Sequence, residues 1–285
     1  MIQVLMDKGI AYQSEDKSIY FSIEKFPEYG KLAKIDRENQ RAGVRISTDE
    51  YAKDSVADFA LWKAWDDKDG DVKWDSPWGP GRPGWHIECS AMSQKYLGKT
   101  FDIHTGGIDN MFPHHEDEIA QSEAANGCKF VNYWLHCEHL TVNRQKMSKS
   151  LGNFFTLRDL IEKGFTGREI RYVLINAHYR SALNFAFEAI EDARKSLARI
   201  DECVEKCTKG VLPDWAKAHV VDFAAAVNDD LNLPKAFASL FELVRETNSR
   251  GGEGVLGAFE KMDEVLGIVF FGKPEKSDIA FICHT

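Results

Sequence analysis

The spacing of apolar positions changes along the chain, from short runs near the N-terminus to long helical stretches near the C-terminus. Residues 1–13 predict a helix, because Ile2, Leu5, Met6 and Ile10 follow helical spacing before the chain turns. Residues 18–23 are rich in β formers and predict a strand, and 58–63 form a second compact apolar stretch. The polar and charged residues 36–58 predict a mobile excursion.

Strands and helices alternate in the middle of the chain. The proline- and glycine-rich run 76–84 predicts a shaped loop, and a helix is expected to begin at Trp85. A strand over 100–104, a helix over 114–125 and a β-rich run over 131–142 follow. This alternation is typical of an α/β fold with a parallel sheet.

The pattern becomes helical from about residue 158 onward. Amphipathic stretches cover 186–206, 214–228 and 234–248, and Pro234 stands at a helix start. These stretches predict an α-helical bundle after the α/β part.

Composition narrows the class of protein. The 285 residues suffice for one large domain or two ordinary ones, and a net charge of −9 argues against non-specific coating of nucleic acid. No apolar run reaches the ~18 residues that span a bilayer, and the N-terminus lacks a signal-peptide pattern, so no membrane association is expected. The six cysteines form no C-x-x-C pair, which favours a reducing, cytoplasmic location.

Three residues could hold a metal ion. His114 and Glu118 are four positions apart on a predicted helix, so they share one face, and Cys89 could add a thiolate from another helix start. Taken alone, the pair is more often an exposed helix face and the cysteine a buried thiol. The consecutive polar residues 114–118 could equally form a solvated helix start, where the helix dipole favours acids, and His115 and Glu116 are given no other role.

Two further segments could bind a nucleotide. Residues 142–150 hold three basic side chains and no acid, which suits a polyphosphate, although an ordinary basic surface turn is an equal alternative. The strand at 100–104 ends close to Gly106 and Gly107, as strands do where open α/β sheets bind nucleotides. Trp85 and His86, which follow the proline- and glycine-rich run, could wall a small pocket, although a tryptophan is more often part of the core.

Three blocks in this order and spacing resemble cysteinyl-tRNA synthetases, which are class I aminoacyl-tRNA synthetases. They are Gly81–Met92, Phe101–Gln121 and the signature loop Lys-Met-Ser-Lys-Ser at 146–150. The resemblance implies an α/β fold: part of a class I Rossmann-like nucleotide-binding domain followed by an α-helical bundle. It also implies ATP-dependent ligation of L-cysteine to tRNA(Cys) through a cysteinyl adenylate.

The resemblance implies a division of the chain into four parts. They are a partial connective insertion (1–78), the second half of the Rossmann-like catalytic domain (79–143), the signature loop with the region that contacts the tRNA stem (144–187), and the helical bundle (188–285).

The resemblance also assigns roles to single residues. Cys89, His114 and Glu118 would bind one zinc ion per chain, and this zinc would select the thiol of cysteine.

Lys146 and Lys149 would be catalytic. Lys149 would bind ATP, which enters with Mg²⁺, and His104 and Gly107 would contact the same nucleotide. Trp85 and His104 would form the amino-acid pocket.

Two parts of the family pattern do not occur in this sequence. One is a fourth zinc ligand, a cysteine early in the nucleotide-binding fold, and the other is an H-x-G-H motif. The expectation is therefore an internal piece whose N-terminal half is missing and which alone is inactive or nearly so.

Two alternatives stay open. One is a related ligase that joins cysteine to an amino sugar in mycothiol synthesis, and the other is a non-catalytic paralogue that binds only zinc or RNA. A set of basic residues after position 150 favours a tRNA acceptor stem, although arginines on helices are often solvated surface: Arg158, Arg168, Arg171, His178 and Arg180.

Overall fold

The computed structural model describes residues 1–35 and 58–270. The excursion predicted over 36–58 therefore lies outside the described residues, apart from Asp58. The chain divides into two compact units, Met1–Cys137 and Glu138–Thr285, called here the N-terminal and C-terminal units. Each unit is described by itself.

The N-terminal unit opens with a short helix and a four-stranded antiparallel sheet of order β1-β2-β3-β4. The elements are α1 (Ile2–Asp7), β1 (Ala11–Gln13), β2 (Ile19–Phe21), the 3-10 helix η1 (Ile23–Lys25), β3 (Phe59–Ala64), the 3-10 helix η3 (Asp67–Asp69) and β4 (Gly81–Pro83).

The single helix predicted over residues 1–13 is wrong. The helix ends at Asp7, and Gly9 adopts a φ of +67°, which turns the chain back on itself. Ala11 then pairs with Phe21 in the sheet, so sheet pairing rather than helical spacing decides the conformation of these residues.

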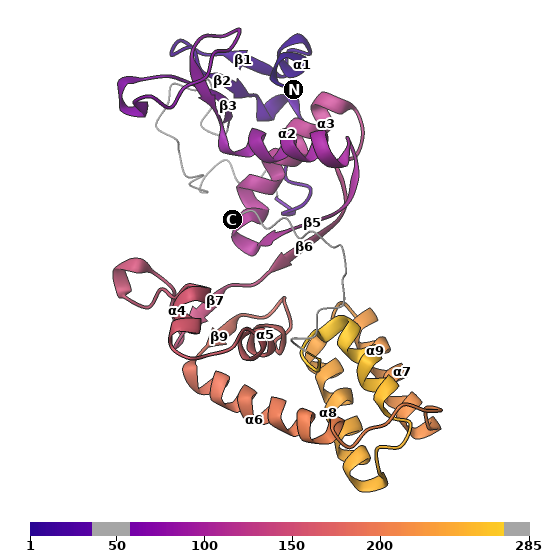
Figure 1. Cartoon of the computed structure of the whole chain (residues 1–285). Coiled ribbons are helices and arrows are strands. Elements are labelled where there is room, and N and C mark those ends of the chain that lie inside the picture. Colours follow the sequence, from indigo (N-terminus) through magenta and orange to yellow (C-terminus); the bar gives the residue numbers. More distant parts are fainter. Residues whose placement is uncertain (36–57, 271–285) are drawn as a thin grey trace. The chain divides into compact units, whose positions relative to one another are not determined.

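The rest of the N-terminal unit is an α/β arrangement. Its elements are α2 (Trp85–Leu97), β5 (Phe101–Gly107), the 3-10 helix η4 (Ile108–Asn110), the π-helical turn η5 (Met111–His115), α3 (Glu116–Asn126) and β6 (Val131–Cys137). Strands β5 and β6 pair in parallel, which confirms the parallel pairing predicted from the alternation. Figure 1 shows α2 and α3 side by side, in agreement with their packing contacts.

A glycine allows α2 to begin where it does. Gly84 is the N-cap of α2, and a Cβ atom at this position would collide with the carbonyl oxygen of Ala60 on β3. The backbone of Gly84 also donates a hydrogen bond to the carbonyl of Leu61. The glycine therefore lets the start of α2 approach the sheet closely.

The C-terminal unit begins with a three-stranded sheet of order β8-β7-β9, in which β7 and β9 are parallel. Its elements up to the last strand are β7 (Leu140–Val142), β8 (Gln145–Lys146), the 3-10 helix η6 (Lys149–Leu151), α4 (Leu157–Glu162), α5 (Gly167–Ile175) and β9 (Leu183–Phe185). Thr156 and Thr166 cap α4 and α5 in capping boxes with Asp159 and Glu169.

Four long helices follow and confirm the predicted helical region (Figure 1): α6 (Phe187–Val204), α7 (Asp214–Asn228), α8 (Leu233–Arg250) and α9 (Leu256–Leu266). Their apolar faces bury one continuous core that includes Ile200, Leu240 and Phe259, all without exposed surface. Among the described residues, no helix is both long and apolar enough to cross a membrane.

Three arginines that the sequence offered for a tRNA stem have partners inside the C-terminal unit. Arg168 donates to the carboxylate of Asp201, and Arg171 to the backbone carbonyl of Leu266. Arg180 donates to the carboxylate of Asp230. These contacts join segments that are up to about 95 residues apart in sequence. At least part of this basic set therefore stabilises the fold of the unit.

Candidate metal centre

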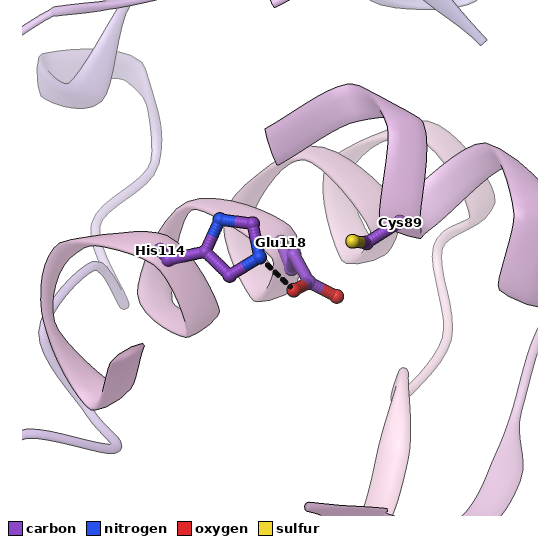
Figure 2. A group of neighbouring side chains, drawn as sticks. All are labelled: Cys89, His114 and Glu118. Atoms are coloured by element: carbon purple, nitrogen blue, oxygen red, sulfur yellow. Dashed lines mark ion pairs between the residues drawn. The ribbon is translucent and has the colours of Figure 1, made fainter. Parts of the chain in front are cut away.

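The three predicted ligands meet in the N-terminal unit. Cys89 comes from α2, His114 from η5 and Glu118 from the first turn of α3, and their ligand atoms all lie within 4.8 Å of one another. Figure 2 shows the imidazole, the carboxylate and the sulfur pointing toward one another. His114 Nε2 lies 3.0 Å from Glu118 Oε1.

The start of α3 is buried, so the interpretation of His114 and Glu118 as an exposed helix-face pair is wrong. Glu118 has no exposed surface and His114 only 5%. The interpretation of residues 114–118 as a solvated helix start is wrong for the same reason, since all five side chains are buried. The turn packs against α2 and the segment 29–33, where its polar groups find partners.

Glu118 is a buried carboxylate with one unsatisfied oxygen. Burial alone would raise its pKa, but the imidazoles of His104 and His114, each with Nε2 3.0 Å from one carboxylate oxygen, outweigh burial and lower the pKa to about 2. Oε2 accepts from His104 Nε2 at 3.0 Å. Oε1, which faces His114, accepts no well-aligned hydrogen bond from the described part of the chain. A buried, charged oxygen of this kind suits a cation.

Cys89 is half-buried beside two carboxylates. Burial, followed by the charges of Glu118 and Glu88, raises the pKa of its thiol to about 11. The thiol is therefore protonated at neutral pH unless a cation compensates the negative charge, and a bound metal ion does so.

The donor set fits zinc. One thiolate, one imidazole and one carboxylate are all zinc ligands, with usual bond lengths of about 2.0–2.3 Å. The 3.0 Å between His114 Nε2 and Glu118 Oε1 lets one ion bind both atoms. Within the described residues this group supplies three ligands, one short of the four of a tetrahedral zinc site.

A second histidine group shares Glu118. His104, His115 and Glu118 also have ligand atoms within 4.8 Å of one another. Burial lowers the pKa of His115 to about 3, and neighbouring imidazoles add to the shift, so this ring is neutral at pH 7. Its Nδ1 lies 2.8 Å from Nε2 of His136 on β6.

Sequence reasoning assigned no role to His136 and none to His115. The parallel pairing of β5 with β6, which the sequence did predict, could have indicated His136. It sets Gly106 opposite His136 near the carboxyl ends of both strands. A Cβ atom on Gly106 would lie 2.6 Å from Cε1 of His115, so the small residue makes room for this ring.

The other two acids of the buried turn hold the segment 29–33. Glu116 accepts backbone N–H groups of Gly30 and Ala33 at 3.0 and 2.7 Å, and Asp117 accepts the Tyr29 hydroxyl at 2.5 Å. Sequence reasoning missed these contacts, because their partners lie more than 80 residues away.

The predicted pocket residues surround the same site. Trp85 is 58% exposed, so its interpretation as a core residue is wrong, and its ring stacks on His114 with 4.0 Å between centroids. His104 stacks on Trp134 at 4.7 Å. Gly107 ends β5, three positions after His104. The structure thus brings Trp85 and His104 to the edges of the metal-binding group.

The signature loop belongs to the C-terminal unit. Lys146 ends β8 and is exposed, and Lys149 begins η6, although its side chain lies outside what the structure describes. Asn153 closes the loop: its Nδ2 donates to the carbonyl of Lys146 at 3.1 Å, and its Oδ1 accepts from the backbone of Ser148 at 2.8 Å. Sequence reasoning did not single out Asn153.

Comparison with known proteins identifies the family of the chain. Residues 1–195 match the family model described as tRNA synthetases class I (C) catalytic domain, and residues 222–271 match a DALR domain. The chain belongs to the class I (C) tRNA synthetases.

Its relatives in this family include proteins named cysteine–tRNA ligase. The protein from Protochlamydia amoebophila is 48% identical over 97% of this chain and 62% of its own length. The protein from Chlamydia trachomatis serovar D is 44% identical over 96% of this chain and 64% of its own length. The chain therefore spans a little over three fifths of these relatives.

Two solved structures support the class I fold. Agrobacterium radiobacter K84 LeuRS, in its complex with tRNA and LeuAMS, matches 70% of this chain and 32% of its own with a TM-score of 0.53. Mycobacterium tuberculosis methionyl-tRNA synthetase, bound by methionyl-adenylate, matches 81% of this chain and 52% of its own with the same score. At 13% identity, both show the fold alone.

The carboxylate of Glu116 predicts a local effect of mutation. In Glu116→Ala the amides of Gly30 and Ala33 lose their acceptor, so their hydrogen exchange should accelerate at least tenfold, which corresponds to a lost hydrogen bond of about 1.4 kcal/mol. Amide exchange by NMR or mass spectrometry measures this. Glu88→Ala, on the exposed side of α2, is the control and should leave both rates unchanged. Unchanged exchange in Glu116→Ala would show that the carboxylate does not hold the segment.

Proposed function

We propose that this chain carries the metal-binding and signature-loop parts of a cysteine–tRNA ligase. The reaction would join L-cysteine to tRNA(Cys) in two steps: the cysteine carboxylate attacks the α-phosphate of ATP, and the tRNA ribose then takes the cysteinyl group from the adenylate. The observation that carries the proposal is the buried group of Cys89, His114 and Glu118 in a chain whose relatives are named cysteine–tRNA ligases.

The ligand group would bind one zinc ion per chain. When bound, zinc offers an open position to a soft thiolate and discriminates against the hydroxyl of serine, a distinction that an apolar pocket makes poorly. Glu118 supports this role with a charged oxygen that lacks a hydrogen bond, and Cys89 with a thiol that only a cation would ionise at neutral pH.

The residues around the metal ligands would form the amino-acid pocket. Trp85 covers one face of the His114 ring and is itself exposed, so it can contact a bound substrate and exclude water from the metal ligands. His104 would face the same substrate while it holds the second oxygen of Glu118. Gly107 would also contact ATP, because it ends β5 and ligands of open α/β sheets bind at the carboxyl ends of the strands. His104, three positions earlier on the same strand, would contact the same nucleotide.

The signature loop would bind the phosphates of ATP, which enters with Mg²⁺. Lys149 and Lys146 carry positive charge in a segment without acids, and such charge is most effective where negative charge develops in the transition state. Asn153 would support this function by holding the backbone between the two lysines.

The four-part division at residues 78, 143 and 187 stays a prediction. In it, the region 144–187 would lie against the tRNA acceptor stem. Arg158 is the basic residue best placed for this contact, because the partners of Arg168, Arg171 and Arg180 lie within the unit. We further propose that the enzyme acts in the cytoplasm.

The zinc site predicts a loss of metal on mutation. Purified chain should bind close to one zinc, whereas Cys89→Ser and His114→Ala should each weaken binding at least tenfold, because each removes one of three protein ligands. Metal analysis after dialysis against a chelator measures the retained zinc. Cys128→Ser, an exposed cysteine outside the group, should keep the full content. Full zinc content in both ligand variants would refute the site.

Activity is best tested in a chimera, because the chain spans 62% of the Protochlamydia relative. With this chain in place of the matching residues of that relative, we expect cysteinylation of tRNA(Cys) and no ligation of cysteine to glucosaminyl-inositol. Lys149→Ala should slow ATP–pyrophosphate exchange by roughly a hundredfold, or ~3 kcal/mol in the barrier.

Lys195→Ala, which removes an exposed lysine on α6, is the control and should exchange at the rate of the parent chimera. A chimera that uses the amino sugar instead of tRNA would contradict the proposed substrate. An unchanged rate in Lys149→Ala would contradict the role of the loop.

A further inference from the structure

A chain of hydrogen bonds runs from the metal ligand His114 away from the metal position. Nδ1 of His114 lies 2.7 Å from Nδ1 of His86, and Nε2 of His86 lies 3.2 Å from Oδ2 of Asp117. The other oxygen of Asp117 accepts the hydroxyl of Tyr29 at 2.5 Å. Four side chains from α2, η5, α3 and the segment after η1 are thus connected in one line.

The protons in this chain can be arranged in only one way if His114 binds a metal through Nε2. A ligating nitrogen carries no proton, so Nδ1 of His114 must carry one and donate it to His86. Nδ1 of His86 then accepts, which leaves the proton of His86 on Nε2, directed at Asp117. Each contact therefore has one donor and one acceptor.

The packing around His86 keeps this ring in place. The ring of Phe59 meets the His86 ring edge-on, with 5.6 Å between centroids. The backbone carbonyl of His86 accepts a hydrogen bond from Nε2 of Gln121 at 2.6 Å. Asp117 is 1% exposed, so its carboxylate acts in a poorly hydrated environment where an oriented hydrogen bond has a large effect. The ring of His114 is held from the other side by Trp85, stacked at 4.0 Å.

We propose that His86 and Asp117 are positioning residues for the metal, which act through His114. The line Tyr29–Asp117–His86–His114 would fix the orientation and tautomer of the ligand ring and increase the electron density on its Nε2, as carboxylate partners of metal-bound histidines do. The inference rests on the zinc site proposed above and extends it to residues that touch neither the ion nor a substrate.

Glu116 and Asp117 are neighbours with different hydrogen-bond partners, so Glu116 offers a matched control for mutations of Asp117. Glu116 precedes Asp117 on the same turn and is equally buried, but its carboxylate accepts from the backbone amides of Gly30 and Ala33, whereas Asp117 faces a histidine. A change from carboxylate to amide at Glu116 therefore disturbs the same turn without entering the line to His114.

The test measures zinc affinity of the purified chain by competition with a chromophoric chelator. His86→Ala and Asp117→Ala should each weaken zinc binding by 10- to 100-fold, the usual effect of losing an outer partner of a metal ligand. Asp117→Asn keeps an oxygen that can accept from His86 and should recover part of that loss. Glu116→Gln should bind zinc as the unchanged chain does.

A cobalt-substituted sample separates ligand positioning from a general structural role. In His86→Ala and Asp117→Asn the visible ligand-field bands of Co²⁺ should shift, whereas Glu116→Gln should leave them in place. Asp117→Asn changes little in shape, so it reports on the line even if an alanine variant fails to fold.

Unchanged zinc affinity and cobalt spectrum in folded Asp117→Asn and His86→Ala would overturn the proposal. An equal loss in Glu116→Gln would overturn it as well, because the effect would then belong to the whole turn. If Cys89→Ser and His114→Ala also fail to weaken zinc binding, the zinc site itself is wrong and not merely its support.

Discussion

The N-terminal unit is organised around a carboxylate that is charged and fully buried at the start of a helix. Burying a charge costs several kcal/mol unless partners compensate it, and the described groups closest to the Glu118 carboxylate are the imidazoles of His104 and His114 and the thiol of Cys89. Gly84 lets α2, which carries Cys89, start close to the sheet, and β5 carries His104. A divalent cation would bind Oε1 of Glu118 on α3 and the thiolate of Cys89 on α2 together. Metal binding would therefore also hold α2 against α3.

The polar residues behind the ligands form two systems with different purposes. Glu116 ties down backbone, while Asp117 faces a histidine that in turn faces His114. Charged side chains also hold elements together in the C-terminal unit, where Arg168 and Arg171 on α5 bond groups on other helices. Glu116, Arg168 and Arg171 therefore stabilise the fold of their units, whereas Asp117 faces the ligand group.

Local spacing offered Cys89, His114 and Glu118 only as possible ligands, and the resemblance to cysteinyl-tRNA synthetases selected them as a metal site. The fold does bring their ligand atoms together. Their burial was not predictable, because it depends on Tyr29 and neighbouring residues far away in sequence, and the sequence interpretation of an exposed turn was wrong. The helix over residues 1–13 failed for a related reason: pairing with Phe21 overrides the local helical spacing. The sequence offered His86 only as a wall of a small pocket; its contacts to His114 and Asp117 were not predictable, because these partners come from two other elements.

The central claim is that Cys89, His114 and Glu118 bind one zinc ion together. X-ray absorption at the zinc edge, measured on the chain loaded with one equivalent of zinc, tests this most directly because it reports the ligand atoms themselves. The account predicts one sulfur at about 2.3 Å and the remaining ligands as nitrogen or oxygen at about 2.0–2.2 Å. A first shell without sulfur, or one with two or more sulfur atoms, would contradict it.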